Sequence, residues 1–151
     1  MEMLLHRFNK QYESSSDISR YIADDIRQFV SQLDVIDGVV EQVELCLVEI
    51  VNNAYEHAYH YVDGCTIEIS CLINSDGDLL VAVSDYGSSI AEDEFKQYIN
   101  SEFIEPNPED PSTWVTSGRG LIIVIELMDK LDFIKEGSKN TFVLHKKISS
   151  R

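Results

Sequence analysis

Several polar side chains interrupt one otherwise apolar segment, and their types suit phosphate chemistry. The segment EIVNNAYEHAY covers residues 49–59. At about 100° per residue, one helical stripe beside the apolar face carries Glu49, Asn53, Glu56 and His60. A carboxylate accepts protons, and an amide oxygen is a ligand suited to Mg²⁺ beside phosphates. From this segment alone, a binding site and a tightly packed structural helix are equally good interpretations.

A second set of candidate residues follows a predicted strand. The segment VSDYGSS, residues 83–89, places Asp85 at the strand end and Gly87 two residues later. A carboxylate in that position accepts a hydrogen bond from an exocyclic amine, and a glycine permits close approach of the backbone to a ligand. Asp and Gly are also ordinary turn residues, so an unremarkable turn remains an alternative.

A third candidate is a pair of glycines at the start of an apolar helix. Gly118 and Gly120 flank Arg119 in TSGRGLIIVIELMD, residues 116–129. Free backbone N–H groups at a helix N-terminus bind anions, whereas the bland alternative is a flexible entry to the helix. The glycines do not follow the first strand, which excludes a Rossmann motif, and no GKS or GKT sequence indicates a P-loop.

Apolar periodicity predicts the elements that must position these residues. Alternation and three- to four-residue spacing predict strands at 3–9, 65–73, 79–85, 132–136 and 141–147, helices at 18–33, 39–61 and 120–131, and turns at 76–77 and 137–140. A long loop, 88–117, holds all three prolines and has room for a short helix at 92–99. This order predicts one α+β domain over 1–151, a two-layer sandwich whose mixed, mostly antiparallel sheet carries helices on one face.

Composition limits the classes of partner and the compartment. Hydrophobic residues make up 44% of the 151 residues, which excludes a disordered chain, and 12 basic against 27 acidic residues give a net charge of −15. Such a surface opposes binding to nucleic acid or an anionic membrane and is compatible with a basic protein partner. Without a membrane span or signal peptide, a cytoplasmic protein is expected, with reduced core thiols at Cys46, Cys65 and Cys71.

Taken together, the three segments resemble the GHKL ATP-binding (Bergerat) fold of gyrase, histidine kinases and MutL. The most similar branch is the anti-sigma factor serine/threonine-protein kinases, whose N box ExxxNAxxHAY is similar to residues 49–59. Residues 85–87 resemble the first glycine motif of that family, and residues 118–121 resemble its second. The segment NTFVL, residues 140–144, is similar to the last strand of the family, GTxxxL, with Thr141 at the threonine position.

The resemblance implies a role for each matching residue. Glu49 would be the catalytic base, and Asn53 would coordinate Mg²⁺ that bridges the ATP phosphates. Asp85 would bind the adenine amino group with Gly87 beside it. Thr141 would support the adenine through water. The remaining matches imply phosphate contacts for Gly118, Arg119 and Gly120 beside a flexible ATP lid at 88–117. His57 and Tyr59 also match the N box, and a structural position is the alternative for both.

The implied function is an Mg-ATP-dependent kinase that phosphorylates a STAS-domain anti-sigma-factor antagonist, alternatively binds a sigma factor, and forms a homodimer. Two residues depart from the family pattern: Ser89 replaces a second glycine, and Asn140 replaces the glycine before Thr141, where it is expected to keep the turn. These departures leave open a nucleotide-binding partner-switching module with weak or no kinase activity. A histidine kinase catalytic domain is less favoured, because no upstream helix carries a phosphoacceptor histidine.

Overall fold

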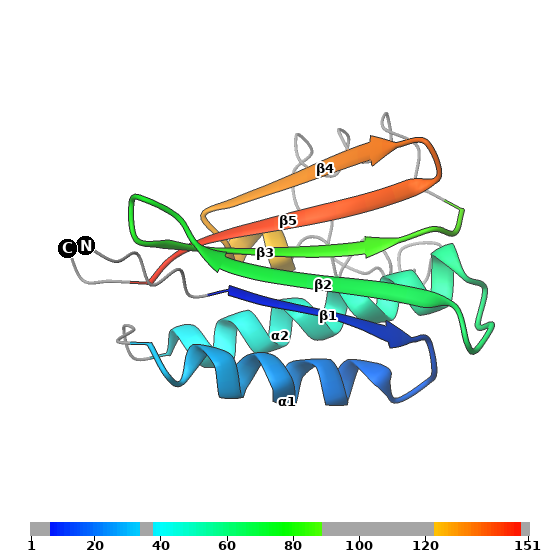
Figure 1. Ribbon diagram of the computed structural model, residues 1–151, viewed down its shortest axis with the longest axis horizontal. Coiled ribbons are helices and arrows are strands. Elements are labelled where there is room, and N and C mark those ends of the chain that lie inside the picture. Colours follow the sequence, from blue (N-terminus) through cyan, green and yellow to red (C-terminus); the bar gives the residue numbers. More distant parts are fainter. Residues whose placement is uncertain (1–6, 34–37, 89–122, 149–151) are drawn as a thin grey trace, which may run out of the picture.

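The protein was analysed as a computed structural model, which describes residues 7–33, 38–88 and 123–148. A sheet forms one layer and helices form the other (Figure 1). The elements are β1 (Arg7–Glu13), α1 (Ile18–Val30), α2 (Val39–Asn53), the π-helical turn η1 (Ala54–Ala58), β2 (Thr66–Ile73), β3 (Asp78–Asp85), β4 (Lys130–Glu136) and β5 (Lys139–Lys147). A further helical segment covers residues 123–127.

The described strands form one sheet in the order β1-β2-β3-β5-β4. Each neighbouring pair is antiparallel, so the α+β sandwich is confirmed, and these strands contain none of the parallel pairing that a mixed sheet implies. β3 lies between β2 and β5, and its last residue, Asp85, is opposite Asn140. This register determines which side chains can share the candidate site.

The core lies between the sheet and the two long helices (Figure 1). Ile22, Ile26 and Val30 recur every four residues of α1, and all three are buried. On α2 the same role belongs to Val43, Leu47, Ile50 and Val51, each at most 1% exposed. Burial of these apolar faces is the main favourable contribution to the fold, and it sets the orientation of α2 against β3.

The first strand extends further along the chain than its apolar content predicts. The expected strand was 3–9, whereas β1 is Arg7–Glu13; residues 3–6 lie outside the described part of the chain. β1 pairs only with β2 among the described strands, so it is an edge strand. Its outward-facing positions are polar, since only one face of an antiparallel edge strand needs apolar side chains.

Two other predicted boundaries near the C-terminus are wrong. The helix expected to reach residue 131 ends at 127, and Lys130 and Leu131 belong to β4. Leu131 fits both periods, because it continues the helical spacing and also alternates with Phe133 along the strand. The turn expected at 137–140 is shorter, since Lys139 and Asn140 are already in β5 and Gly137, at φ +60°, takes the left-handed backbone conformation.

The three cysteines are free thiols, as their apolar surroundings predict. Cys46 and Cys71 are buried, and that burial raises the pKa of each thiol to about 12. Such thiols are unreactive at neutral pH, so they act as small apolar core residues. Among the described helices, none has the length and apolar character needed to cross a bilayer.

Candidate functional site

Two polar residues of α2 lie one turn apart near the C-terminal end of the helix. Glu49 and Asn53 are both half-buried, beside the fully buried Ile50. Neither side chain hydrogen-bonds to a residue that the structure describes. The Glu49 carboxylate and the Asn53 amide oxygen are therefore available to a ligand at the edge of the core, as far as the described residues are concerned.

The helix changes its hydrogen-bonding pattern immediately after Asn53. The Tyr59 N–H donates to the Ala54 carbonyl oxygen at 2.9 Å, a spacing of five residues that widens the turn into η1. Single π-helical turns within helices are frequent at functional sites. The helix predicted to reach residue 61 therefore ends at Ala58, and His60, at φ +51°, leaves the predicted polar stripe. Its Nε2 instead lies 3.4 Å from Ser88 Oγ.

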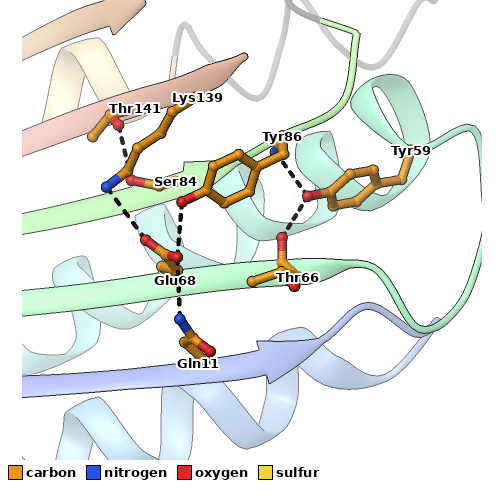
Figure 2. Close-up of polar contacts among 8 residues, drawn as sticks. All are labelled: Gln11, Tyr59, Thr66, Glu68, Ser84, Tyr86, Lys139 and Thr141. Atoms are coloured by element: carbon orange, nitrogen blue, oxygen red, sulfur yellow. Dashed lines mark hydrogen bonds and ion pairs between the residues drawn. The ribbon is translucent and has the colours of Figure 1, made fainter. Parts of the chain in front are cut away.

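The segment after β3 is fastened to this π-helical turn. The Ser88 N–H donates to the Ala58 carbonyl oxygen at 2.9 Å, and the Tyr86 N–H donates to the Tyr59 hydroxyl at 2.8 Å. The same hydroxyl donates to the Thr66 carbonyl oxygen (Figure 2). Tyr59 therefore joins the end of η1 to the start of β2 and to the segment after β3. A structural position for Tyr59 agrees with these contacts.

Gly87 is in close contact with the backbone of η1. A Cβ atom at this position would lie 2.3 Å from the Ala58 carbonyl oxygen and 2.8 Å from Tyr59 Cδ1. The glycine was expected to permit close approach of a ligand, but the group that approaches here is the protein's own carbonyl. Gly87 therefore lets the segment after β3 dock against the end of η1, which continues α2.

Asp85 is a buried carboxylate on the helix-facing side of β3, only 7% exposed. Its Oδ1 accepts hydrogen bonds from the Gly87 N–H at 3.0 Å and from Asn140 Nδ2 at 2.9 Å. Burial raises the pKa of Asp85, while these two hydrogen bonds oppose the rise by stabilising the ionised form. The arrangement presents a buried acceptor at the end of a strand, as an amine-binding role requires.

The structure brings Asn140, rather than Thr141, to Asp85. Asp85 is opposite Asn140 and Ser84 is opposite Thr141, so the two pairs face opposite sides of the sheet. The Thr141 hydroxyl lies 2.8 Å from Ser84 Oγ on the face without helices (Figure 2). The sequence contained a signal for this, because Phe142 and Leu144 are apolar core residues and strict alternation from them places residue 140, not 141, on the core side.

A polar network on the helix-free face anchors the same loop from the other side. The Tyr86 hydroxyl donates to Glu68 Oε2 at 2.8 Å, and Lys139 Nζ lies 3.3 Å from Glu68 Oε1 (Figure 2). Gln11 on β1 also donates to Glu68. Because Tyr86 follows Asp85 directly, these contacts restrain the backbone that aims the Asp85 carboxylate. Neither Glu68 nor Lys139 belongs to a motif that the sequence pattern indicates.

The remaining predicted residues lie outside the described part of the chain. These are Gly118, Arg119, Gly120, the lid at 88–117 beyond Ser88, the short helix at 92–99, and Ser89. The described part of the site therefore consists of the end of α2, η1 and the facing ends of β3 and β5.

A family model for the histidine kinase-like ATPase domain matches residues 15–146. The chain belongs to this family. The match includes α2, β3 and most of β5, the elements that carry Glu49, Asn53, Asp85 and Asn140. It confirms the GHKL-type fold that the three motifs indicated.

Individual relatives agree with that assignment. The chain is 24% identical to an anti-sigma F factor of Clostridium acetobutylicum over 145 residues, which cover 96% of this chain and 95% of that protein. It is similar to the RsbU and RsbW domains of a Mycobacterium tuberculosis protein, with a TM-score of 0.67 at 16% identity over 96% of this chain. This chain spans 33% of the length of that protein.

Two further solved structures share the fold. SiaB in the SiaB–SiaC complex from Pseudomonas aeruginosa is similar at a TM-score of 0.63 and 12% identity, covering 91% of this chain and 88% of the other. A blue-light activated histidine kinase from Erythrobacter litoralis is similar at a TM-score of 0.56 and 20% identity, covering 79% of this chain and 33% of the kinase.

Proposed function

We propose that this protein is an Mg-ATP-dependent serine/threonine-protein kinase that acts as an anti-sigma factor. Its substrate would be a STAS-domain anti-sigma-factor antagonist, and it would alternatively bind a sigma factor. The observation that carries the proposal is the buried Asp85 carboxylate, held through Gly87 against η1, the turn that directly follows the helix with Glu49 and Asn53. Family membership and the likeness to an anti-sigma F factor support it.

Asp85 and Asn53 would hold the two ends of the nucleotide. The Asp85 carboxylate, which is only 7% exposed, accepts a hydrogen bond from the adenine amino group. Asn53 would hold Mg²⁺, because its amide oxygen is the kind of hard, neutral ligand that this ion accepts and no described residue uses it. When bound, Mg²⁺ supplies charge neutralisation on the phosphates.

Glu49 would act as the base one helical turn before Asn53. Its carboxylate takes the proton of the attacking seryl or threonyl hydroxyl while the hydroxyl oxygen forms a bond to the γ-phosphorus. The bond from that phosphorus to the bridging oxygen breaks, and ADP leaves with the electron pair. Positioning contributes most of the rate in such transfers, which makes the contacts between the end of η1 and the segment after β3 important.

The proposed partners follow from charge and from the relatives. A net charge of −15 suits a basic surface on a sigma factor. SiaB, a neighbour in fold, was solved in complex with a second protein, SiaC, which is in keeping with a protein substrate for this chain. The homodimer, the cytoplasmic location and the phosphate contacts of Gly118, Arg119 and Gly120 are further parts of the proposal.

A partner-switching module that binds nucleotide with weak or no kinase activity is the second candidate. The observation that favours it is the departure from the family pattern at Ser89 and Asn140, each of which stands where a glycine is expected. The retained Glu49 favours the kinase, because a module that only binds nucleotide needs no base at this position.

Phosphotransfer from labelled ATP to a purified STAS-domain antagonist tests the kinase. Glu49→Ala is expected to keep Mg-ATP binding and to lose transfer by about a hundredfold or more, the usual contribution of a general base. The matched control is Glu41→Ala, which removes an exposed carboxylate from the first turn of the same helix and should transfer normally. Normal transfer by Glu49→Ala would refute the assignment of the base. Antagonist binding without transfer by the unmodified protein would favour the module.

A further inference from the structure

Asn140 carries a buried polar atom that the fold leaves without a partner. The residue is 2% exposed and lies on the helix-facing side of β5. Its Oδ1 is buried and accepts no hydrogen bond within the described chain. Buried amide oxygens are almost always satisfied, so an orphaned one beside a candidate ligand site calls for a ligand or an ordered water.

The orientation of this amide is determined by its other end. Nδ2 donates to Asp85 Oδ1 at 2.9 Å and to the Gly87 carbonyl oxygen at 3.0 Å. Both partners are acceptors, so only the NH₂ group can face them, and a flipped amide would set oxygen against oxygen. Oδ1 is therefore directed away from the β3 loop, with its lone pairs unused.

The neighbouring carboxylate contributes a second unused acceptor. Both hydrogen bonds that Asp85 accepts from described residues use Oδ1, and its Oδ2 accepts none from them. Since the two side chains are joined by a hydrogen bond, the free oxygen of Asp85 and the free oxygen of Asn140 belong to one cluster. That cluster offers acceptors only, and its two donors are already committed.

We propose that Asn140 is a nucleobase-reading residue that, together with Asp85, selects a purine with an exocyclic 6-amino group. The amine has two N–H donors, one for Asp85 Oδ2 and one for Asn140 Oδ1. A 6-oxo group would instead place a third acceptor against this cluster, and an unpaired buried acceptor is strongly rejected. The inference rests on the proposed function in that the ligand is a purine nucleotide.

Asn140 has a second role toward the same group. Its NH₂ ties the carboxylate of β3 to the carbonyl of Gly87, which keeps the loop folded over the strand end. A purely structural clamp would need only this donor end. Only base reading uses the acceptor Oδ1 of Asn140, whereas clamping of the loop uses the donor Nδ2. The test must therefore remove a hydrogen from the ligand amine as well as the side chain of Asn140.

Calorimetric titrations with Mg-ATP and Mg-N6-methyl-ATP provide that test. Methylation removes one of the two amine hydrogens, and the unmodified protein should bind the methylated nucleotide about tenfold more weakly, the effect of one lost hydrogen bond. In Asn140→Leu the acceptor is gone, so ATP itself should bind about tenfold more weakly. The methylation penalty, the ratio of the dissociation constants for N6-methyl-ATP and ATP, should then fall below about threefold. An unchanged penalty in that variant would overturn the inference.

The control is the same substitution in the turn between β2 and β3. Asn74 Oδ1 accepts hydrogen bonds from the backbone N–H groups of Asp76 and Asp78, so Asn74→Leu also removes polar contacts from a turn but should leave the methylation penalty unchanged. If Asn140→Leu fails to fold, Asn140→Thr keeps a strand-compatible residue without the amide oxygen. Thr141→Val tests whether the neighbouring residue reads the base. If Thr141→Val loses the methylation penalty and Asn140→Leu keeps it, the assignment to Asn140 is contradicted.

The two proposals fail in different ways. If the unmodified protein takes up neither nucleotide, the proposed function fails and this inference fails with it. If it binds Mg-ATP and the methylation penalty survives in Asn140→Leu, only the base-reading role of Asn140 is refuted.

Discussion

Replacement of Gly87 by alanine is expected to separate the segment after β3 from the end of η1. The added Cβ would lie 2.3 Å from the Ala58 carbonyl oxygen and 2.6 Å from its carbon. Ordinary contacts begin near 3.4 Å, so the two backbones must move apart by about 1 Å. Both are main chain, so no side-chain rotation relieves the overlap.

The movement would break three hydrogen bonds of the loop. These are Ser88 N–H to Ala58 O at 2.9 Å, Tyr86 N–H to the Tyr59 hydroxyl at 2.8 Å, and Asn140 Nδ2 to Gly87 O at 3.0 Å. At roughly 0.5–1.5 kcal/mol each, their loss lowers the free energy of unfolding by about 2–4 kcal/mol. In urea unfolding with a slope near 2 kcal/mol/M, the midpoint should fall by about 1–2 M.

Gly64→Ala is the matched control. Gly64 has a φ of +85° with nothing within 4 Å of an added Cβ, so alanine there meets open space and costs only about 1–2 kcal/mol of left-handed backbone strain. It should leave nucleotide binding unchanged, whereas Gly87→Ala should weaken it because Asp85 loses its support. A midpoint for Gly87→Ala that is no lower than that of Gly64→Ala would refute the packing argument.

Two further predictions concern carboxylates. Asp85→Asn should weaken Mg-ATP binding at least about tenfold in calorimetry and lose the preference for ATP over GTP. The reason is that the new amide nitrogen, a donor, would face either Asn140 Nδ2 or the adenine amine, which are donors too. A full preference for ATP in this variant would contradict the adenine assignment. The hydrogen bond from the Tyr12 hydroxyl lowers the pKa of Asp25. Partial burial works against this lowering, and Lys10 adds to it. Its contribution is therefore present above about pH 4 and lost as the pH falls through the lowered pKa, so Asp25→Asn should cost about 1 kcal/mol in urea unfolding at pH 7 and progressively less in acid. A difference that stays constant down to pH 2 would contradict this linkage.

Much of the fold follows from the spacing of apolar residues. The recurrence of Ile22, Ile26 and Val30 predicts α1, and the alternation of Ile67, Ile69 and Cys71 predicts β2, because a single buried face imposes each period. The apolar pattern predicts too early an end for β1, because an edge strand needs few apolar residues. The helix before β4 was extended too far because Leu131 satisfies both periods.

The site was predictable as a set of motifs and less so as geometry. Asp85 and Gly87 are brought together with the end of α2, although Gly87 accommodates the protein's own carbonyl. The π-helical turn after Asn53 has no simple sequence pattern, since its hydrogen bonds depend on the loop docked against it. The family motif indicates Thr141 by its residue type, whereas the pleat of β5 places Asn140 beside Asp85.

The direct test of the central claim is calorimetric titration of the folded protein with ATP in the presence of Mg²⁺. The account predicts saturable binding of one nucleotide per chain, weakened in Asp85→Asn and dependent on Mg²⁺ through Asn53. Absence of heat and of any shift in unfolding midpoint, with folded protein and saturating Mg-ATP, would contradict it.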